Sequence, residues 1–411
     1  MKQQWISGNS FDLLENGEQF YPAVFEAIAA AQKEILLETF ILYDDKVGRA
    51  LQSELIAAAQ RGVQVDMTID GWGSPGLSKE FLSALTSAGV RVHVFDPMPG
   101  FLRRINLFRR LHRKLVVIDG ATAFVGGINF SADHLLDFGP EAKQDYSVRV
   151  RGPIVAEIHA FALRAVKGKA FNWRGTRRGE RRPPSLPTAG DADAIFVWRD
   201  NHRHTRDIER QYRVAIRLAK ERVMIANAYF FPGYAFLRDL RKAARRGVKV
   251  SLILQGNPDM AIVQIAAGML YHHLLSAGVE IYEYCDRPLH GKVAAVDDEW
   301  ATVGSSNLDP LSLSLNLEAN VVIRDRAFNA RLSETLQRLM QESCKKIDIR
   351  DLKEAGWWRV LRGYLLFHLL RRYPAWLGWL PAHAPKIESI AENEAGVEKV
   401  SEGKGERLVH E

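Results

Sequence analysis

The chain has 411 residues, 47% of them hydrophobic, and a formal net charge of +7. This length can bury more than one core, so two domains are expected. Only Cys285 and Cys344 are present, far apart and without metal-ligand spacing, so the sequence supports neither a disulfide framework nor a zinc site and favours a reducing, cytoplasmic setting. The modest basic excess suggests an anionic partner without choosing between nucleic acid and anionic lipid.

The sequence contains no recognisable membrane-spanning segment. Its amino-terminal stretch Met1–Asn9 is too polar for a signal peptide, and no apolar run approaches the roughly 20 residues needed to cross a bilayer. We therefore expect a soluble or peripheral protein.

Hydrophobic periodicity in the first half predicts helices that alternate with strands. Apolar residues recur at helical spacing after Tyr21, and a strand-like apolar run follows Glu34. The predicted order is helix 21–33, strand 34–41, helix 47–61, strand 63–69, helix 78–88 and strand 89–95.

The second half repeats these parts. Arg246-Gly247-Val248 parallels Arg61-Gly62-Val63, and Ser276-Ala277-Gly278-Val279 parallels Ser87-Ala88-Gly89-Val90. Such a duplication of alternating helices and strands predicts an α/β fold of two pseudo-twofold-related α/β/α lobes with mixed, largely parallel sheets.

Composition divides the chain further. An Arg- and Pro-rich stretch separates the two copies and reads as an exposed linker, and the charged end of the chain is poor in aromatic residues and reads as disordered. The expected divisions are a first lobe 1–166, a linker 167–193, a second lobe 194–350, a Trp- and Arg-rich membrane-proximal segment 351–385 and a disordered tail 386–411.

A short motif occurs once in each copy. Histidine, lysine and aspartate share one spacing in both, and a pair of small residues and an asparagine follow at matching offsets. The members are His112, Lys114, Asp119, Gly126-Gly127 and Asn129 in the first copy, and His290, Lys292, Asp297, Gly304-Ser305 and Asn307 in the second.

The Val- and Ile-rich residues after each lysine predict strands, in which alternate side chains share a face. His112 and Lys114 are therefore expected on one face of their strand, and His290 and Lys292 on one face of theirs. The motif as a whole gives a catalytic set that includes Asp119 and Asp297. Within that set we expect the two aspartates to be structural, because each lies an odd number of residues beyond its histidine and Asp119-Gly120 is typical of a hairpin turn.

A single histidine near a lysine is usually an ordinary surface or core residue. Two copies that meet about a pseudo-twofold axis would instead form one cleft with two imidazoles, two ammonium groups and two amides. Such a cleft suits a phosphodiester, and its lysines disfavour a metal. One imidazole can attack phosphorus while the other protonates the leaving alkoxide, and the lysines with Asn129 and Asn307 hold the phosphoryl oxygens.

A nucleophilic histidine needs an acceptor at its remote nitrogen. Asp145 in the first copy and Glu318 in the second are candidates, each able to orient a histidine of its own lobe or of the other. The alternative, a solvated acid at the start of a strand, carries equal weight for each.

The doubled motif resembles that of the phospholipase D superfamily. From Leu14 to about Arg350 the chain looks like a bacterial cardiolipin synthase, notably in Glu38-Thr39-Phe40, Gly62-Val63, Arg110–Lys114, Gly126–Asn129 and Tyr229–Pro232. The resemblance implies transfer of a phosphatidyl group from one phosphatidylglycerol to another, giving cardiolipin and glycerol, without a metal or nucleotide cofactor. It also implies His112 as nucleophile and His290 as acid and base, although the similarity of the two motifs leaves this order open.

Many members of that family begin with two membrane-spanning helices, so this chain resembles a shorter, peripheral form on the cytoplasmic side of the membrane. Two stretches, 101–111 and 357–379, combine aromatic and arginine residues and are expected to contact an anionic membrane surface. Packing of the second stretch on the second lobe is the alternative.

Three other functions share parts of this pattern. A phospholipase D-type hydrolase, or a transferase with another alcohol acceptor, would use the same site. A nuclease of the superfamily would too, and the basic excess is compatible with phosphate contacts. The apolar mass beside the arginines favours lipid over nucleic acid, so no nucleic-acid partner is expected. A non-catalytic membrane scaffold is disfavoured because both motifs are intact.

Overall fold

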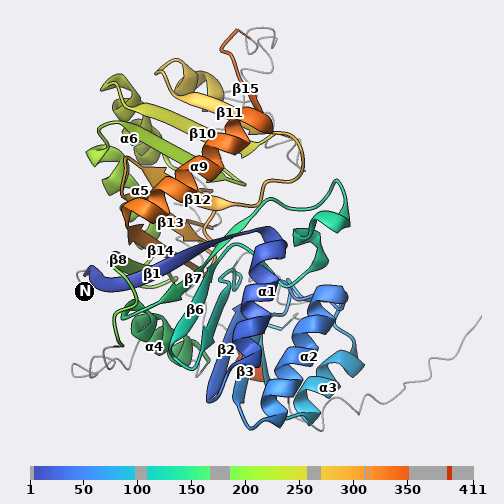
Figure 1. Cartoon of the computed structure of the whole chain (residues 1–411). Helices are drawn as coiled ribbons and strands as arrows, with labels where there is room; N and C mark the ends of the chain where they lie inside the picture. Colours follow the sequence, from blue (N-terminus) through green and yellow to red (C-terminus); the bar gives the residue numbers. More distant parts are fainter. Residues whose placement is uncertain are drawn as a thin grey trace, which may run out of the picture.

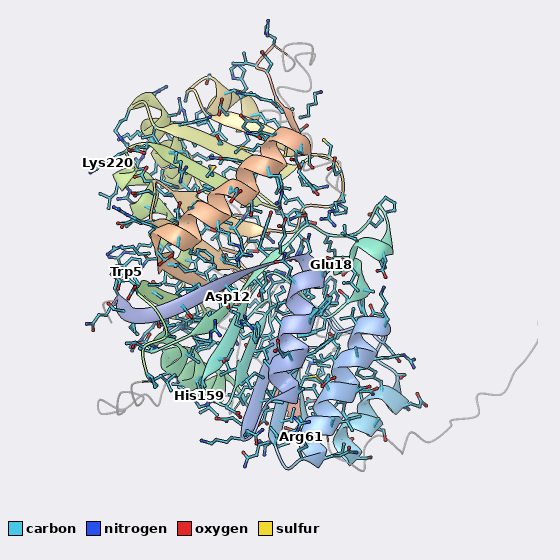
Figure 2. All side chains as sticks on the ribbon, in the orientation of Figure 1. Trp5, Asp12, Glu18, Arg61, His159 and Lys220 are labelled. Carbon is cyan, nitrogen blue, oxygen red and sulfur yellow. The ribbon has the colours of Figure 1, made fainter. Side chains whose placement is uncertain are left out.

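The computed structural model of the protein describes residues 4–97, 109–166, 186–256, 270–309, 312–313, 315–350 and 387–390. Figure 1 shows two lobes, with the first half of the sequence below and the second half above in that view, and with strand β1 running between them. Side chains fill the interior of both lobes in the same orientation (Figure 2).

The first lobe alternates helices and strands as predicted. Its strands are β1 (Ile6–Glu15), β2 (Glu34–Thr39), β3 (Gln64–Asp70), β4 (Arg91–Phe95), β5 (Leu115–Ile118), β6 (Thr122–Gly126) and β7 (Tyr146–Arg151). Its helices are α1 (Asn16–Ala29), α2 (Lys46–Gln60), α3 (Lys79–Ser87) and α4 (Ile154–Val166), and two short 3₁₀ turns, η2 (Ala132–His134) and η3 (Leu136–Phe138), follow β6. The predicted helices and strands up to β4 are confirmed, with ends that differ by a few residues.

The second lobe repeats the order. Its strands are β8 (Ala192–Arg199), β9 (Arg222–Asn227), β10 (Lys249–Gln255), β11 (Glu280–Tyr284), β12 (Lys292–Val296), β13 (Trp300–Gly304), β14 (Glu318–Arg324) and β15 (Cys344–Lys346). Its helices are α5 (Asp207–Leu218), α6 (Tyr234–Arg245) and α9 (Arg326–Glu342). Strand β16 (Ile387–Ser389) returns to the first lobe.

The two lobes share one mixed sheet. Its order is β15-β11-β10-β9-β12-β13-β14-β8-β1-β7-β6-β5-β2-β3-β4-β16. From either edge towards the centre, the corresponding strands of the two lobes follow in the same order, for example β10-β9-β12 in one lobe and β3-β2-β5 in the other. Strands β1 and β8 join the halves in antiparallel fashion, with Ile6 opposite Ala194 and Asn9 opposite Ala192. In each half, the strands that follow helices run parallel and the strands around the motif run antiparallel. The prediction of two related lobes with mixed sheets is confirmed.

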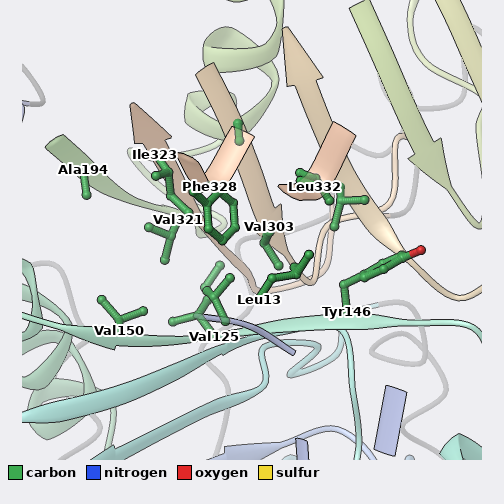
Figure 3. Close-up of a cluster of buried hydrophobic side chains, with 14 of the residues drawn as sticks. Leu13, Val125, Tyr146, Val150, Ala194, Val303, Val321, Ile323, Phe328 and Leu332 are labelled. Carbon is green, nitrogen blue, oxygen red and sulfur yellow. The ribbon is translucent and has the colours of Figure 1, made fainter. Parts of the chain in front are cut away.

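A shared hydrophobic core lies between the halves. It takes Val125, Val150 and Tyr146 from the first lobe and Val303 and Val321 from the second, all buried (Figure 3). Helices α4 and α9 contribute further side chains to this core, and α9 also contacts β1. Burial on this scale favours docking of the lobes, since apolar area gains about 25 cal/mol per Å² removed from water. The motifs are thereby held on a common, rigid base.

Each outer helical layer has a core of its own, made by α1, α2 and α3 in the first lobe and by α5 and α6 in the second. Local sequence explains where these helices begin. Asp45 accepts hydrogen bonds from the backbone N–H groups of Val47 and Gly48 at the start of α2, and Ser78 accepts one from Phe81 at the start of α3. Helix α2 is followed by Gly62, whose positive φ of 89° suits glycine.

The tail prediction needs one correction. Strand β16 pairs with β4 inside the segment 386–411 that was expected to be disordered, and Ser389 hydrogen-bonds His93 through its hydroxyl group. For these three residues the prediction is wrong, because the edge of β4 offers unpaired backbone groups that a short extended segment can satisfy. Composition alone does not reveal such a partner.

The remaining segment predictions stay predictions. Most of the linker 167–193 lies outside the described residues, although β8 already begins at Ala192. The stretch 101–108, the segment 351–385 and the tail from 391 also lie outside them. Among the helices that are described, none is long and apolar enough to cross a membrane.

Candidate active site

Each motif histidine is held by the backbone of the opposite lobe. The N–H of His112 donates to the carbonyl of Leu317 at 3.0 Å, and the N–H of His290 donates to the carbonyl of Gln144 at 2.8 Å. Isolated bridges pair Leu111 with Leu317 and Gln144 with Leu289. The backbone N–H of each histidine is bonded across the lobe interface and not within its own sheet. For this reason the regular strands β5 and β12 begin only after the histidines.

These bridges bring each imidazole to a carboxylate of the other lobe. Nδ1 of His112 lies 3.0 Å from Oε1 and 3.1 Å from Oε2 of Glu318, and Nδ1 of His290 lies 2.6 Å from Oδ2 of Asp145. Glu318 and Asp145 are fully buried. Of the two arrangements that the sequence left open, the structure has the exchanged one, in which each carboxylate serves the histidine of the other lobe.

The carboxylates determine the tautomer of each ring. An ionised carboxylate only accepts hydrogen bonds, so Nδ1 of each histidine carries the proton and Nε2 keeps its lone pair. Burial lowers the pKa of both imidazoles, and for His112 Glu318 opposes this effect. Both rings are therefore neutral near pH 7, with Nε2 able to attack an electrophile or to take up a proton.

The two lysines add positive charge to the same site. Lys114 donates to the backbone carbonyl of His112 at 2.8 Å, and Lys292 donates to that of His290. Burial lowers the pKa of Lys114 to about 7 and that of Lys292 to about 8, and the charge of Lys292 further lowers the pKa of Lys114. An anion between them would restore the protonated forms, as expected of a site that binds phosphate.

Each motif also has a buried asparagine whose amide group is only partly hydrogen-bonded. Asn129 accepts a hydrogen bond from the N–H of Ile41 at 3.2 Å, while its Nδ2 is buried without a partner among the described residues. Oδ1 of Asn307 is likewise buried without a partner in the described part of the chain. Rotation of that amide would present its NH₂ group in the same place. Both amides thus retain hydrogen-bonding capacity for a phosphoryl oxygen.

Asp119 and Asp297, the last members of each motif, lie elsewhere. Asp119 accepts hydrogen bonds from the backbone N–H groups of residues 32, 33 and 34, and Asp297 accepts them from residues 220, 221 and 222. Each follows its strand at the end away from the lysine, five residues and roughly 17 Å further along at about 3.3 Å per residue. Their place in the predicted catalytic set is therefore corrected, and the structural role expected from the turn pattern agrees with their contacts.

Comparison with known proteins identifies the family. The model of the family described as "Cardiolipin synthase, PLD-like domain" matches residues 24–160 and 212–340, which is more than half of the chain. Cardiolipin synthase B of Salmonella typhi is 56% identical over 395 residues, covering 95% of this chain and 94% of that protein. Cardiolipin synthase B of Escherichia coli K12 is 54% identical over 391 residues, with the same coverage of both chains.

The chain belongs to the cardiolipin synthase family with PLD-like domains. The family inferred from the doubled motif is confirmed, as is cardiolipin synthase function as a phosphatidyltransferase at the level of the family.

Solved structures agree on the fold of this cardiolipin synthase family member. Phosphatidylserine synthase from Haemophilus influenzae Rd KW20 superimposes with a TM-score of 0.69, covering 92% of this chain and 97% of that protein at 13% identity. Polyphosphate kinase from Porphyromonas gingivalis gives a TM-score of 0.56 at 16% identity, over 89% of this chain and 53% of that protein. Such distant likenesses concern the fold alone.

Two further residues contact the imidazoles of this family member, and sequence reasoning missed both as site residues. The ring of Phe40 lies 5.0 Å from that of His112, and the ring of His134 lies 5.5 Å from that of His290. Phe40 directly follows β2, and His134 ends η2 only five residues after Asn129. The closeness of His134 to the motif was the available signal, but nothing in its spacing distinguishes it from an ordinary buried histidine.

Three described side chains form a group with potential metal-ligand geometry: His134, Asp145 and His290, whose donor atoms lie within 4.8 Å of one another. Their surroundings disfavour a cation. The ammonium groups of Lys292, Lys143 and Lys114 all lower the pKa of His290 by their positive charge. The same field that repels a proton would repel a divalent metal more strongly.

Proposed function

We propose that this chain transfers a phosphatidyl group from one phosphatidylglycerol to the glycerol hydroxyl of a second, giving cardiolipin and glycerol. The single observation that carries the proposal is the exchanged pair of histidine–carboxylate contacts, which unites two imidazoles and two buried lysines in one site. Such a site binds a phosphodiester and supplies both a nucleophile and a proton donor without a cofactor.

In the first step, Nε2 of His112 attacks phosphorus of the donor lipid. Binding of the anionic phosphodiester favours the imidazolium form of His290, whose ring is neutral in the free site near pH 7. The bond from phosphorus to the glycerol headgroup oxygen breaks, and this imidazolium gives its Nε2 proton to that oxygen. Free glycerol leaves, and the phosphatidyl group stays on His112. Lys114, Lys292, Asn129 and Asn307 hold the non-bridging oxygens as negative charge develops on them.

In the second step, the headgroup hydroxyl of another phosphatidylglycerol gives its proton to the now neutral His290. The resulting oxygen nucleophile attacks phosphorus, the nitrogen–phosphorus bond breaks, and cardiolipin forms. If water enters instead, the products are phosphatidic acid and free enzyme. The transferase outcome thus depends on whether a lipid hydroxyl or water reaches phosphorus first.

The order of the histidines is supported by the difference between their carboxylates. Interactions with His112, Lys114 and the hydroxyl of Ser305 hold the pKa of Glu318 below its usual value despite burial, so this carboxylate remains ionised and strengthens Nε2 of His112 as a nucleophile. Burial raises the pKa of Asp145 to about 6, closer to that of an imidazole. The Asp145–His290 pair is therefore suited to taking up and releasing a proton.

We further propose that the protein acts at the surface of an anionic membrane, peripherally and on its cytoplasmic side. The +7 net charge favours an anionic surface, and an acyl-chain substrate requires access to a bilayer. The stretches 101–111 and 357–379, most of which lies outside the described residues, carry the aromatic and arginine side chains suited to this contact.

The test is product analysis by mass spectrometry. Purified protein is incubated with phosphatidylglycerol vesicles and, separately, with single-stranded DNA, and His112→Ala serves as the matched control. We expect cardiolipin and glycerol in equal amounts from the wild type and neither from the variant. Phosphatidic acid as the main lipid product would favour the hydrolase, and cleavage of DNA without any lipid product would refute the proposal.

A further inference from the structure

His134 is a fully buried imidazole that the proposed mechanism does not use. Its Nδ1 points to Oδ2 of Asp145 at 3.8 Å and has no hydrogen-bond partner among the described residues. The same carboxylate oxygen accepts the 2.6 Å hydrogen bond from His290. Asp145 thus lies between two imidazoles, one of which belongs to the proposed reaction.

The other nitrogen of His134 determines its tautomer. The backbone N–H of Asn129 donates to Nε2 of His134 at 3.3 Å, so Nε2 is the acceptor. Burial, together with the charge of Lys143, lowers the pKa of this imidazole far below its usual value, so the ring is neutral. A neutral ring that accepts at Nε2 carries its proton on Nδ1, and that proton is directed at the carboxylate.

In the second lobe, a different group stabilises the corresponding carboxylate, Glu318. Glu318 receives a hydrogen bond from the hydroxyl of Ser305 at 2.5 Å in addition to that from His112. The first lobe has Gly127 at the position of Ser305, and a Cβ atom there would lie 2.3 Å from Oδ1 of Asp145. No hydroxyl can be placed on Asp145 from this position.

We propose that His134 is a positioning residue for Asp145. Its Nδ1–H, directed at Oδ2 from 3.8 Å, favours the carboxylate electrostatically, whereas Glu318 receives a direct hydrogen bond from Ser305. It orients the carboxylate toward His290 and favours the ionised form that the imidazolium of His290 requires. The inference rests on the proposed role of His290 as acid and base.

Other charged groups also face this carboxylate. Lys292, Lys114 and Lys143 favour its ionised form, and the backbone N–H of Tyr146 donates to its Oδ1 at 2.8 Å. Asp133, which forms an ion pair with Lys143, faces His134 and favours protonation of that ring. Because all of these remain in a His134 variant, any change in such a variant reports the imidazole itself.

Two substitutions separate the roles of the two ring nitrogens. His134→Asn keeps an NH₂ group near the position of Nδ1 and loses the acceptor for Asn129. His134→Gln keeps an acceptor near the position of Nε2 and loses the donor for Asp145. The readout is the pH profile of kcat/KM for glycerol release from phosphatidylglycerol vesicles, which transfer and hydrolysis both produce.

We expect His134→Gln to lose about tenfold in kcat/KM and to move the acidic limb to higher pH by about half a unit to one unit, because loss of a donor raises the pKa of Asp145. His134→Asn is expected to keep the limb of the wild type. Ser305→Ala, the matched control in the second lobe, should leave this limb in place. Any other pattern for the Asn and Gln pair would overturn the inference.

Failure of the proposed function would look different. If His290→Ala releases glycerol at the rate of the wild type, the acid and base role of His290 is wrong whatever the His134 variants do. If the wild type releases glycerol without making cardiolipin, only the acceptor is wrong, and the His134 experiment keeps its meaning. Thermal melting of both variants verifies that each is folded.

Discussion

The two lobes repeat one architecture but surround their histidines differently. Strand order, the cross-lobe bridges and the Asp119 and Asp297 turns are the same in both. At the site, His112 contacts the aromatic ring of Phe40 and a glutamate, whereas His290 contacts the imidazole of His134 and an aspartate. The common parts fix where the reacting groups lie, and the differing parts adjust what each group does.

A second difference lies directly beside the motif. Arg113, between His112 and Lys114, forms a buried ion pair with Glu38 at 2.8 Å. The second lobe has Gly291 and Ala226 at the equivalent positions, and a Cβ atom on Gly291 would lie 2.8 Å from the ring of Tyr146. The first motif is therefore fixed to its own sheet by charge, while the second packs closely against the first lobe. The two copies thus share a backbone fold but use different contacts to hold the motif in place.

The largest effect should come from either reacting imidazole. We expect His112→Ala and His290→Ala each to lower transfer by about a thousandfold or more, because one removes the nucleophile and the other the proton donor. Circular dichroism should show an intact fold in both. Samples denatured at alkaline pH, which preserves the phosphorus–nitrogen bond, should show a phosphohistidine in His290→Ala and none in His112→Ala. The reverse result would invert the roles of the lobes. Activity near that of the wild type in either variant would remove the mechanism.

Exchanging the carboxylates between lobes should have the next largest effect. Asp145→Glu places a longer side chain in the space beside Gly127, and Glu318→Asp withdraws the carboxylate from His112 by one methylene group. Each is expected to lower kcat by about 10- to 100-fold, as is usual when the partner of a reacting imidazole is displaced. Ser305→Gly, which removes only a hydroxyl donor, should cost about tenfold or less. Equal activity in all of these variants and the wild type would mean that the two environments are interchangeable.

The pH dependence should report the same asymmetry with a smaller effect. As pH falls through about 6, Asp145 gains a proton, because burial has raised its pKa to about 6, and His290 loses its acceptor. As pH rises through about 7 and then about 8, Lys114 and Lys292 lose the ammonium charges that hold phosphate. The kcat/KM profile should therefore be bell-shaped with its maximum between these limits. The acidic limb should change in Asp145→Asn and persist in Glu318→Gln. These groups titrate roughly between pH 5 and 9, so a flat profile over that range would contradict this account.

The smallest effect on activity is expected where the lobes are alike. Asp119→Ala and Asp297→Ala each remove an acceptor from backbone N–H groups and should lower the free energy of unfolding by about 1–3 kcal/mol. Their activity should stay within about threefold of the wild type, since hydrogen bonds far from the reacting atoms change stability more than rate. The Asn variants serve as controls, because asparagine tolerates the positive φ of 53° and 50° at these positions. A large loss of activity with unchanged stability would return the aspartates to the catalytic set.

The sequence predicted most of the local structure and brought the two motifs into one site, while the roles of their side chains stay predictions. Periodicity was sufficient for the elements from α1 to β4 but missed β1, and the recurrence of His112 and Lys114 as His290 and Lys292 was sufficient for a common site. The partners of the carboxylates were open, because spacing along the chain says nothing about which lobe a side chain faces. His134 was missed because its role depends on Gly127, whose lack of a side chain matters only once Asp145 lies against it.

The exchanged carboxylates also bear on how the protein matures. While the first half of the chain is being synthesised, Glu318 is still to be added and cannot orient His112. Asp145 likewise lacks His290, the reacting imidazole that it contacts in the folded protein. Competence to cleave lipid arises in one event, when both halves have folded and docked. A nascent or truncated polypeptide that lacks the second half therefore lacks a complete site and cannot cleave lipid. No inhibitory segment is needed to keep it inactive.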